Sequence, residues 1–345
     1  MPDHTVNPTR RSQAAFIAVL ILAAAHLPFL YVQCKTLWSL EHYQFFPFAF
    51  AVFGWLFYTR RVQGVVFWDA FSSLLLVADV GLLVGGSVMN SPLAVYSGAV
   101  LLCFVISRAS ADAEYDRSLA YLGLLPLITV RPPLAMDTNI INWLQAVTTK
   151  VGSLLLNHFG YLHVREGNIL EFPGKRFLVQ EACSGVQSLF AVLFLASLIV
   201  CGYRRRFLHS VLVLFCGAGF AGLMNVLRIC TISIAWDVYG MDLSTGWQHD
   251  MLGYIALMSA AFLVFSADAF LDLVFYPVPD TVGGGVSLLY RNPLIVFWNR
   301  VFGVRKRKSL PESGFSSPPK VWHTIAVVGA AVVFIGVMVF QIPNI

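Results

Sequence analysis

Charge is scarce in this sequence. Lysine, arginine, aspartate and glutamate together make up 12% of the 345 residues, against ~25% in an ordinary soluble domain. Hydrophobic residues account for 58%, and the mean hydropathy is +0.73. This balance excludes a soluble globular enzyme and a disordered chain, and it predicts a membrane protein with many spans. The net charge of +5 therefore gives no indication of nucleic-acid binding, and we expect no nucleic-acid partner.

Cysteine is also scarce, with six residues in the chain. They form no Cys-x-x-Cys pair and no Cys/His spacing typical of zinc, which excludes a disulfide scaffold and leaves no predicted metal or cofactor site. Most of them lie inside apolar runs, where a thiol behaves as a small hydrophobe. Cys183 is the exception, since it stands at the very start of such a run.

Nine apolar runs follow one another along the chain and predict an all-α transmembrane bundle of about eight or nine spans. They cover residues 14–31, 45–58, 65–84, 92–107, 118–130, 182–202, 207–236, 251–274 and 321–341. If the N-terminus lies inside and the sides alternate, sixteen of the 23 lysines and arginines fall in inner segments. The positive-inside rule therefore predicts a cytoplasmic N-terminus in the cell membrane.

Two segments between the predicted spans have patterns of their own. Apolar residues recur at helical spacing and predict an amphipathic helix on the outer surface: Ile140, Leu144, Val147, Val151, Leu154, Leu155, Phe159 and Leu162. A turn at residues 164–168 and a hairpin with strands at 169–172 and 177–180 follow it. Residues 276–320 form the second segment, which we interpret as a cytoplasmic linker with an interfacial helix. The domains are thus a core at 1–275, this linker, and an extra span at 321–345.

Three polar residues are expected at one depth of the predicted bundle. Cys183 lies 21 residues before Arg204, Arg228 lies 22 after Arg206, and His249 lies 23 before Asp272. At 1.5 Å per residue each separation is roughly 32–35 Å, about the thickness of a bilayer core. Three consecutive helices would therefore present a thiol, a fixed cation and an imidazole at the same outer edge.

These three side chains have complementary chemistry. A helix N-terminus and a nearby arginine both favour the thiolate form of Cys183, which is the nucleophilic form. Arg228 stays charged and is suited to hold a carbonyl oxygen or the oxyanion formed from it. The imidazole of His249 is suited to pass a proton to a leaving amine. The pattern predicts a nucleophile, a charge stabiliser and an acid/base at one level of the bundle.

The sequence around these residues resembles the exosortase/archaeosortase family of membrane transpeptidases. The resemblance rests on residues 181–185 (Glu-Ala-Cys-Ser-Gly), 225–228 (Asn-Val-Leu-Arg) and 249–250 (His-Asp). Residues 144–145, 160–169 and 42–61 are also similar to the family, so the resemblance covers about residues 14–275. It implies catalytic roles for Cys183, Arg228 and His249. Four further residues are implied as supporting the site: Glu181, Ser184, Asn225 and His42.

The resemblance also implies a substrate class. It implies an enzyme that cuts a C-terminal sorting tail from exported proteins. Such a tail has a short motif such as Pro-Glu-Pro, a single span and a basic cluster. The acyl group would pass from the cysteine to an acceptor that the sequence does not identify. In that scheme Arg228 donates a proton or orients the carbonyl, and His249 stabilises the transition state. Two other functions stay open: a small-solute transporter, for which Asp79 inside a span would be a relay, and a non-catalytic scaffold.

Overall fold

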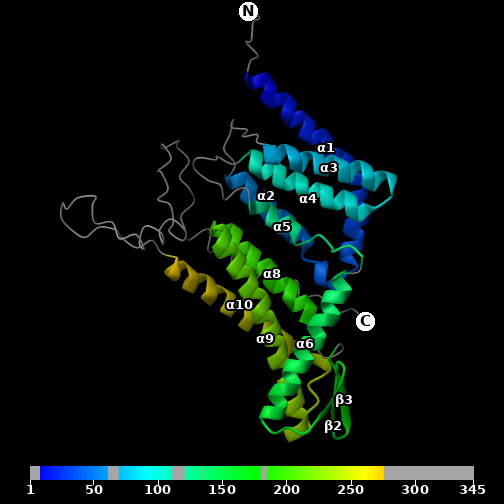
Figure 1. The fold of residues 1–345 in the computed structure, drawn as a ribbon, viewed down its shortest axis with the longest axis vertical. Helices are drawn as coiled ribbons and strands as arrows, with labels where there is room; N and C mark the ends of the chain where they lie inside the picture. Colours follow the sequence, from blue (N-terminus) through cyan, green and yellow to red (C-terminus); the bar gives the residue numbers. More distant parts are fainter. Residues whose placement is uncertain (1–7, 61–69, 111–120, 135, 180–184, 276–345) are drawn as a thin grey trace, which may run out of the picture.

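The computed structural model describes residues 8–60, 70–110, 121–134, 136–179 and 185–275. Within these ranges the chain is mostly helical and carries one small antiparallel sheet (Figure 1). The helical bundle is thus confirmed. The predicted linker at 276–320 and the span at 321–341 lie outside the described residues.

The N-terminal helices form one group. It contains α1 (Pro8–Trp38), the 3-10 turn η1 (Glu41–Tyr43), α2 (Phe46–Arg60), α3 (Ala70–Val88) and α4 (Pro92–Ala109). A tight turn joins α3 to α4, and Ser91 begins α4 by accepting a hydrogen bond from the N–H of Ala94. Gly86 allows the two helices to approach, because a Cβ there would lie 2.8 Å from Val95. Figure 1 shows α3 and α4 side by side, crossed by α1.

A fully buried polar pair links α1 to α3. His26 Nε2 lies 3.0 Å from Asp79 Oδ1, and His26 Nδ1 lies 2.7 Å from the carbonyl oxygen of Leu22. A carbonyl only accepts, so Nδ1 carries a proton, and a second proton must lie between Nε2 and the carboxyl group. The pair is therefore either imidazolium and carboxylate or imidazole and carboxylic acid, and its net charge is zero in both cases. This neutrality explains how Asp79 is tolerated in an apolar helix.

The prediction of a span at 118–130 is wrong for the part that the structure describes. Residues 121–130 contain a 3-10 turn at 121–123 and a single α-helical turn, α5 (Leu124–Leu127), followed by turns. Pro126 lacks an N–H, and its carbonyl oxygen accepts from both the N–H and the hydroxyl of Thr129, at 3.1 and 2.6 Å, where the helix ends. The segment is packed inside the protein, where Tyr96 bonds to Thr129 at 2.6 Å. Irregular backbone is tolerated at membrane depth when it is buried in this way.

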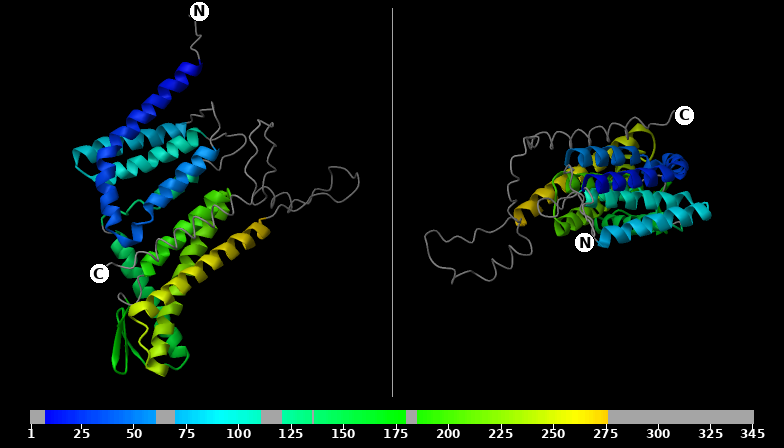
Figure 2. Two further views of the ribbon diagram at one scale, coloured as in Figure 1. Left: turned by 180° about the vertical axis from the view of Figure 1, so that it is seen from behind. Right: turned by 90° about the horizontal axis from the view of Figure 1, so that it is seen from above.

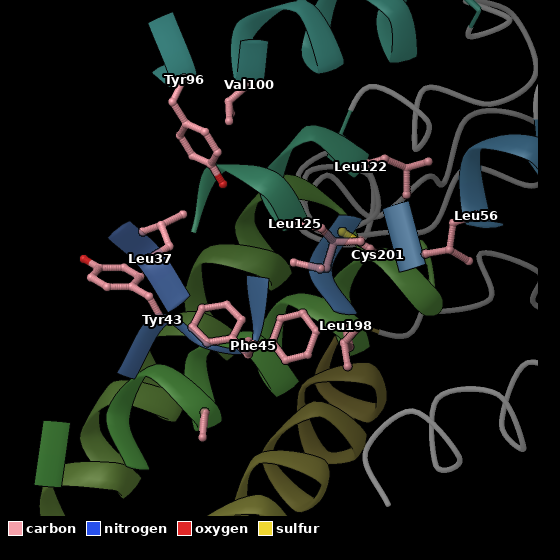
Figure 3. Close-up of a cluster of buried hydrophobic side chains, with 13 residues drawn as sticks. Leu37, Tyr43, Phe45, Leu56, Tyr96, Val100, Leu122, Leu125, Leu198 and Cys201 are labelled. Carbon is pink, nitrogen blue, oxygen red and sulfur yellow. The ribbon is translucent and has the colours of Figure 1, made fainter. Parts of the chain in front are cut away.

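A core of aromatic and aliphatic side chains joins the N-terminal group to the rest of the molecule. It draws on α1, η1, α2, α4, α5 and the later helix α8 (Figure 3). Phe45 and Phe194 face each other in it, with ring centroids 5.1 Å apart. Segments more than 140 residues apart in the chain are thus fixed relative to one another.

The second group is a three-helix bundle of α8 (Gly185–Gly202), α9 (Phe207–Tyr239) and α10 (Gly246–Val274). All three helices contact one another and lie below the N-terminal group in Figure 1. Within the described residues α3, α9 and α10 are long and apolar enough to cross a membrane, and Pro92–Arg108 and Gln187–Gly202 are shorter apolar helices.

A charged cluster closes one end of this bundle. Arg205 donates two hydrogen bonds to Asp268, at 2.9 and 2.6 Å, and a third to Asp272. His209 lies 2.8 Å from the same Asp268 carboxylate. Arg60 donates to the carbonyls of the last two residues of α8 at 2.6 and 2.9 Å, which caps that helix. We call this end the arginine end.

The opposite end, called here the sheet end, carries α6 (Met136–His158) and three strands, β1 (Val164–Glu166), β2 (Ile169–Phe172) and β3 (Lys175–Leu178). Figure 2 shows the strands beside α6 at the far end of the molecule from α1. The sheet thus has one strand more than the predicted two-stranded hairpin. Residues 164–166, interpreted as a turn, pair with β2 because Gly167 makes the tight turn at φ 59°. The last strand covers 175–178 rather than 177–180.

The helix α6 confirms the predicted amphipathic segment, but the face that it buries carries several polar side chains. Polar side chains point into the protein against α9: Gln145, Thr148, Thr149 and Ser153 are buried. The apolar side chains of Ile140, Trp143, Val151, Leu154 and Phe159 are exposed. The exposed apolar side chains are suited to contact with lipid. The hydroxyls of Thr148 and Thr149 donate to backbone carbonyl oxygens one turn earlier, so they need no partner on α9.

Candidate active site

Arg228 and His249 meet at the sheet end of the three-helix bundle. Arg228 lies in α9 and is 8% exposed. Its Nη2 lies 2.9 Å from His249 Nε2 and donates to the His249 carbonyl oxygen at 3.0 Å. The common depth that the sequence predicts for these two residues is therefore confirmed.

The contact fixes the tautomer of His249. A guanidinium group has donors and no acceptor, so Nε2 accepts the hydrogen bond and carries no proton. The ring proton is then on Nδ1, which lies 3.5 Å from Asp250 Oδ1. In this arrangement His249 is neutral and holds the guanidinium in position.

Two glycines allow this geometry. Gly240 ends α9 with a left-handed φ of 63°, and the N–H of Met241 bonds back to Ala235, so the chain turns at once toward α10. Gly253 lies one turn after His249. A Cβ at Gly253 would lie 3.2–3.4 Å from the guanidinium atoms of Arg228. The guanidinium thus rests directly on the backbone of α10.

Asn225 and His42 are the other predicted residues that the structure describes. Asn225 lies one turn before Arg228, is 5% exposed, and lines a small cavity with it. His42 lies in η1 and packs on Phe190 of α8, with ring centroids 5.3 Å apart. Cys183, Glu181 and Ser184 lie outside the described residues, so their roles stay predictions.

Sequence reasoning missed several contacts that organise the site. Gly253 was one of 26 glycines, and nothing in its local sequence marks the approach of Arg228. A second is the pair Ser153 and His163: His163 Nδ1 donates to the Tyr161 carbonyl at 3.0 Å, so its Nε2 accepts from the Ser153 hydroxyl at 2.7 Å. This bond fastens the segment before β1 to α6.

One ion pair fixes the sheet near the site. Lys175 of β3 pairs with Asp242 in the loop between α9 and α10. Hydrogen bonds from Lys175 and Ser244 lower the pKa of Asp242 to about 2. Among the described residues no group of three histidine, cysteine, aspartate or glutamate side chains is arranged to hold a metal ion.

The helices and the Arg228–His249 pair define a multi-pass membrane protein with a polar centre at one end of its bundle. The chain belongs to the transmembrane exosortase (EpsH) family, whose model matches residues 37–266, about two thirds of its length. The match includes Arg228, His249 and the three-helix bundle except for the last turns of α10, and it leaves out nearly all of α1. No curated protein and no solved structure shows significant similarity to the chain.

Proposed function

We propose that this protein is a membrane cysteine peptidase or transpeptidase that cleaves C-terminal sorting tails from exported proteins. The observation that carries the proposal is the contact between Arg228 and His249 at one end of the three-helix bundle. Family membership supports the substrate class, a PEP-CTERM-like tail with a short motif, a span and a basic cluster.

Each residue has a distinct role in the proposed reaction. Cys183 attacks the scissile carbonyl as a thiolate and forms a thioester. Arg228 donates to the carbonyl oxygen. When that oxygen replaces His249 Nε2 as the partner of Nη2, the imidazole becomes able to take the thiol proton and to return it to the leaving amine. An acceptor nucleophile, or water, then releases the acyl group.

The proposal includes a location and a domain division. The sheet end faces outward, the arginine end and the N-terminus face the cytoplasm, and the surrounding lipid bilayer belongs to the cell membrane. Residues 1–275 form the catalytic core, which contains the whole family match. Residues 276–320 are a cytoplasmic linker, and 321–345 add a span.

Co-expression with a tailed substrate tests the proposal. We expect the protein to shorten the substrate and the Cys183→Ala variant to leave it intact. Arg228→Lys should also fail, because lysine keeps the charge but loses the planar fork that can hold the substrate oxygen and the His249 carbonyl oxygen together. Removing one such donor typically lowers the rate by ~10²–10³.

The transporter alternative is favoured by one observation, the neutral His26–Asp79 pair buried among the N-terminal helices. A relay would place these residues on the working path. Normal substrate cleavage by an Asp79→Asn variant, together with failure of Cys183→Ala, would favour the peptidase. Cleavage that survives Cys183→Ala at near the normal rate would favour the transporter or scaffold.

A further inference from the structure

A small cavity lies between α8, α9 and α10, next to Arg228 on the side of the arginine end. Ser188, Asn225 and Arg228 supply its polar lining, and Gly253 and Ala256 face it from α10. It has room for no more than about one water-sized group. The cavity is thus large enough for a single oxygen atom and too small for a carboxylate or a phosphate.

Asn225 is the informative residue in this cavity. It is 5% exposed, and its carboxamide makes no hydrogen bond within the described part of the chain. The nitrogen and oxygen of this amide are not among the fully buried polar atoms, so they border the cavity, where a ligand or a water normally satisfies such a group. Asn225 therefore points to an occupant of the cavity.

The lining determines what kind of group fits. Arg228 only donates hydrogen bonds, and the amide of Asn225 has two donor hydrogens beside one acceptor oxygen. The two residues are three apart on α9 and lie on the same face of the helix. Two donors on one wall favour a hydrogen-bond acceptor, and the available volume limits that acceptor to one oxygen.

We infer that Asn225 and Arg228 together bind the scissile carbonyl oxygen of the sorting tail, which makes Asn225 a catalytic residue. This inference rests on the proposed function. Attack of the Cys183 thiolate forms the C–S bond and moves the carbonyl π pair onto oxygen, where Asn225 and Arg228 stabilise the charge. Collapse restores the carbonyl, breaks the C–N bond, and the amine leaves with the proton held by His249. Before substrate binds, a water occupies the cavity and satisfies the amide.

The test measures single-turnover thioester formation by the full-length protein in membranes, with a tailed peptide substrate. Asn225→Asp keeps the size but replaces the donor with an acceptor, and Asn225→Leu removes both. We expect each to slow acylation by ~10²–10³, with substrate capture unchanged in a Cys183→Ala background. Ser233→Ala is the matched control, since Ser233 is buried on the same helix but does not line the cavity.

A second substrate distinguishes an Asn225 amide that contacts the scissile carbonyl oxygen from one that only binds a structural water. Sulfur in place of the scissile carbonyl oxygen is a poor hydrogen-bond acceptor, so a thioamide substrate should react more slowly with the parent protein. We expect this oxygen-to-sulfur rate ratio to shrink markedly in Asn225→Leu. An unchanged ratio, or Asn225 variants that acylate at the parent rate, would overturn the inference while leaving Cys183 chemistry intact. Acylation that persists in Cys183→Ala would instead overturn the proposed function.

Discussion

The position of the Arg228 guanidinium depends on the absence of a side chain at Gly253. At Gly253 a Cβ would lie 3.2–3.4 Å from three guanidinium atoms of Arg228. Alanine favours a helix by up to ~1 kcal/mol over glycine, so Gly253→Ala should not unfold α10. It should move the guanidinium by a few tenths of an ångström and weaken both bonds to His249.

We therefore expect Gly253→Ala to lower the cleavage rate by ~10–10²-fold, since small misplacements of a catalytic group are costly. Rates and thermal unfolding of the purified protein check this. Gly222→Ala is the control, because a Cβ at Gly222 of α9 meets open space. Equal cleavage rates for the two variants would show that Arg228 does not need its close contact with the backbone of α10.

The helix α1 is tied to α3 through the His26–Asp79 pair, and Gly98 of α4 closes over it. A Cβ at Gly98 would lie 2.9 Å from Asp79 Oδ1 and 3.2 Å from His26 Nε2. Asp79→Asn keeps a donor for His26 Nε2, whereas Asp79→Leu and Gly98→Ala break the arrangement.

We expect the Asp79→Asn variant to have nearly the same free energy of unfolding in detergent as the parent protein. His26→Ala leaves a buried carboxyl group without its partner and should cost roughly 1–3 kcal/mol. Cleavage by Asp79→Asn should be close to normal, because the pair lies in the N-terminal group. If Asn proved as damaging as Leu, the pair would depend on ionic charge rather than on hydrogen bonding.

The sheet is held to the α9–α10 loop by the Lys175–Asp242 pair. The pKa of Asp242 falls to about 2 in the folded protein, from 3.8. A lowered pKa means that the stabilisation is fully present above about pH 4 and disappears as the pH falls toward 2. Protease sensitivity of the sheet should rise over this interval, and Asp242→Asn should show the higher sensitivity already at pH 7. An Asn variant with the parent pH profile would contradict the assignment.

The sequence predicted the helices well because long apolar runs at membrane thickness have few alternative structures. It also placed Arg228 and His249 at one depth, because helical rise converts residue counts into length. The prediction of a span at 118–130 fails for residues 121–130, which form only short helical turns packed largely inside the protein. The sequence also failed to give the face of α6 that packs on α9, because amphipathicity alone does not say which side meets lipid. Contacts such as Arg228 with Gly253 depend on helix packing, which no local pattern encodes.

The whole molecule is polar at both ends of its bundle. Arg205, His209 and Asp268 meet at the arginine end, and Arg228 and His249 near the sheet end. We expect a cysteine introduced at Glu166, on the exposed strand β1, to react with a membrane-impermeant thiol reagent in intact cells. A cysteine at Arg206, exposed at the other end, should react only after lysis. The reverse pattern would contradict the proposed orientation and place the site on the cytoplasmic side.

The central claim is that Cys183 carries the acyl group. Its most direct test is to trap the tailed substrate on the protein and to examine the adduct by mass spectrometry. We predict a thioester at Cys183 that hydroxylamine releases, that disappears in Cys183→Ala, and that accumulates more slowly in Arg228→Lys. A substrate that is cleaved with no adduct, or by the Cys183→Ala variant at near the normal rate, would contradict the account.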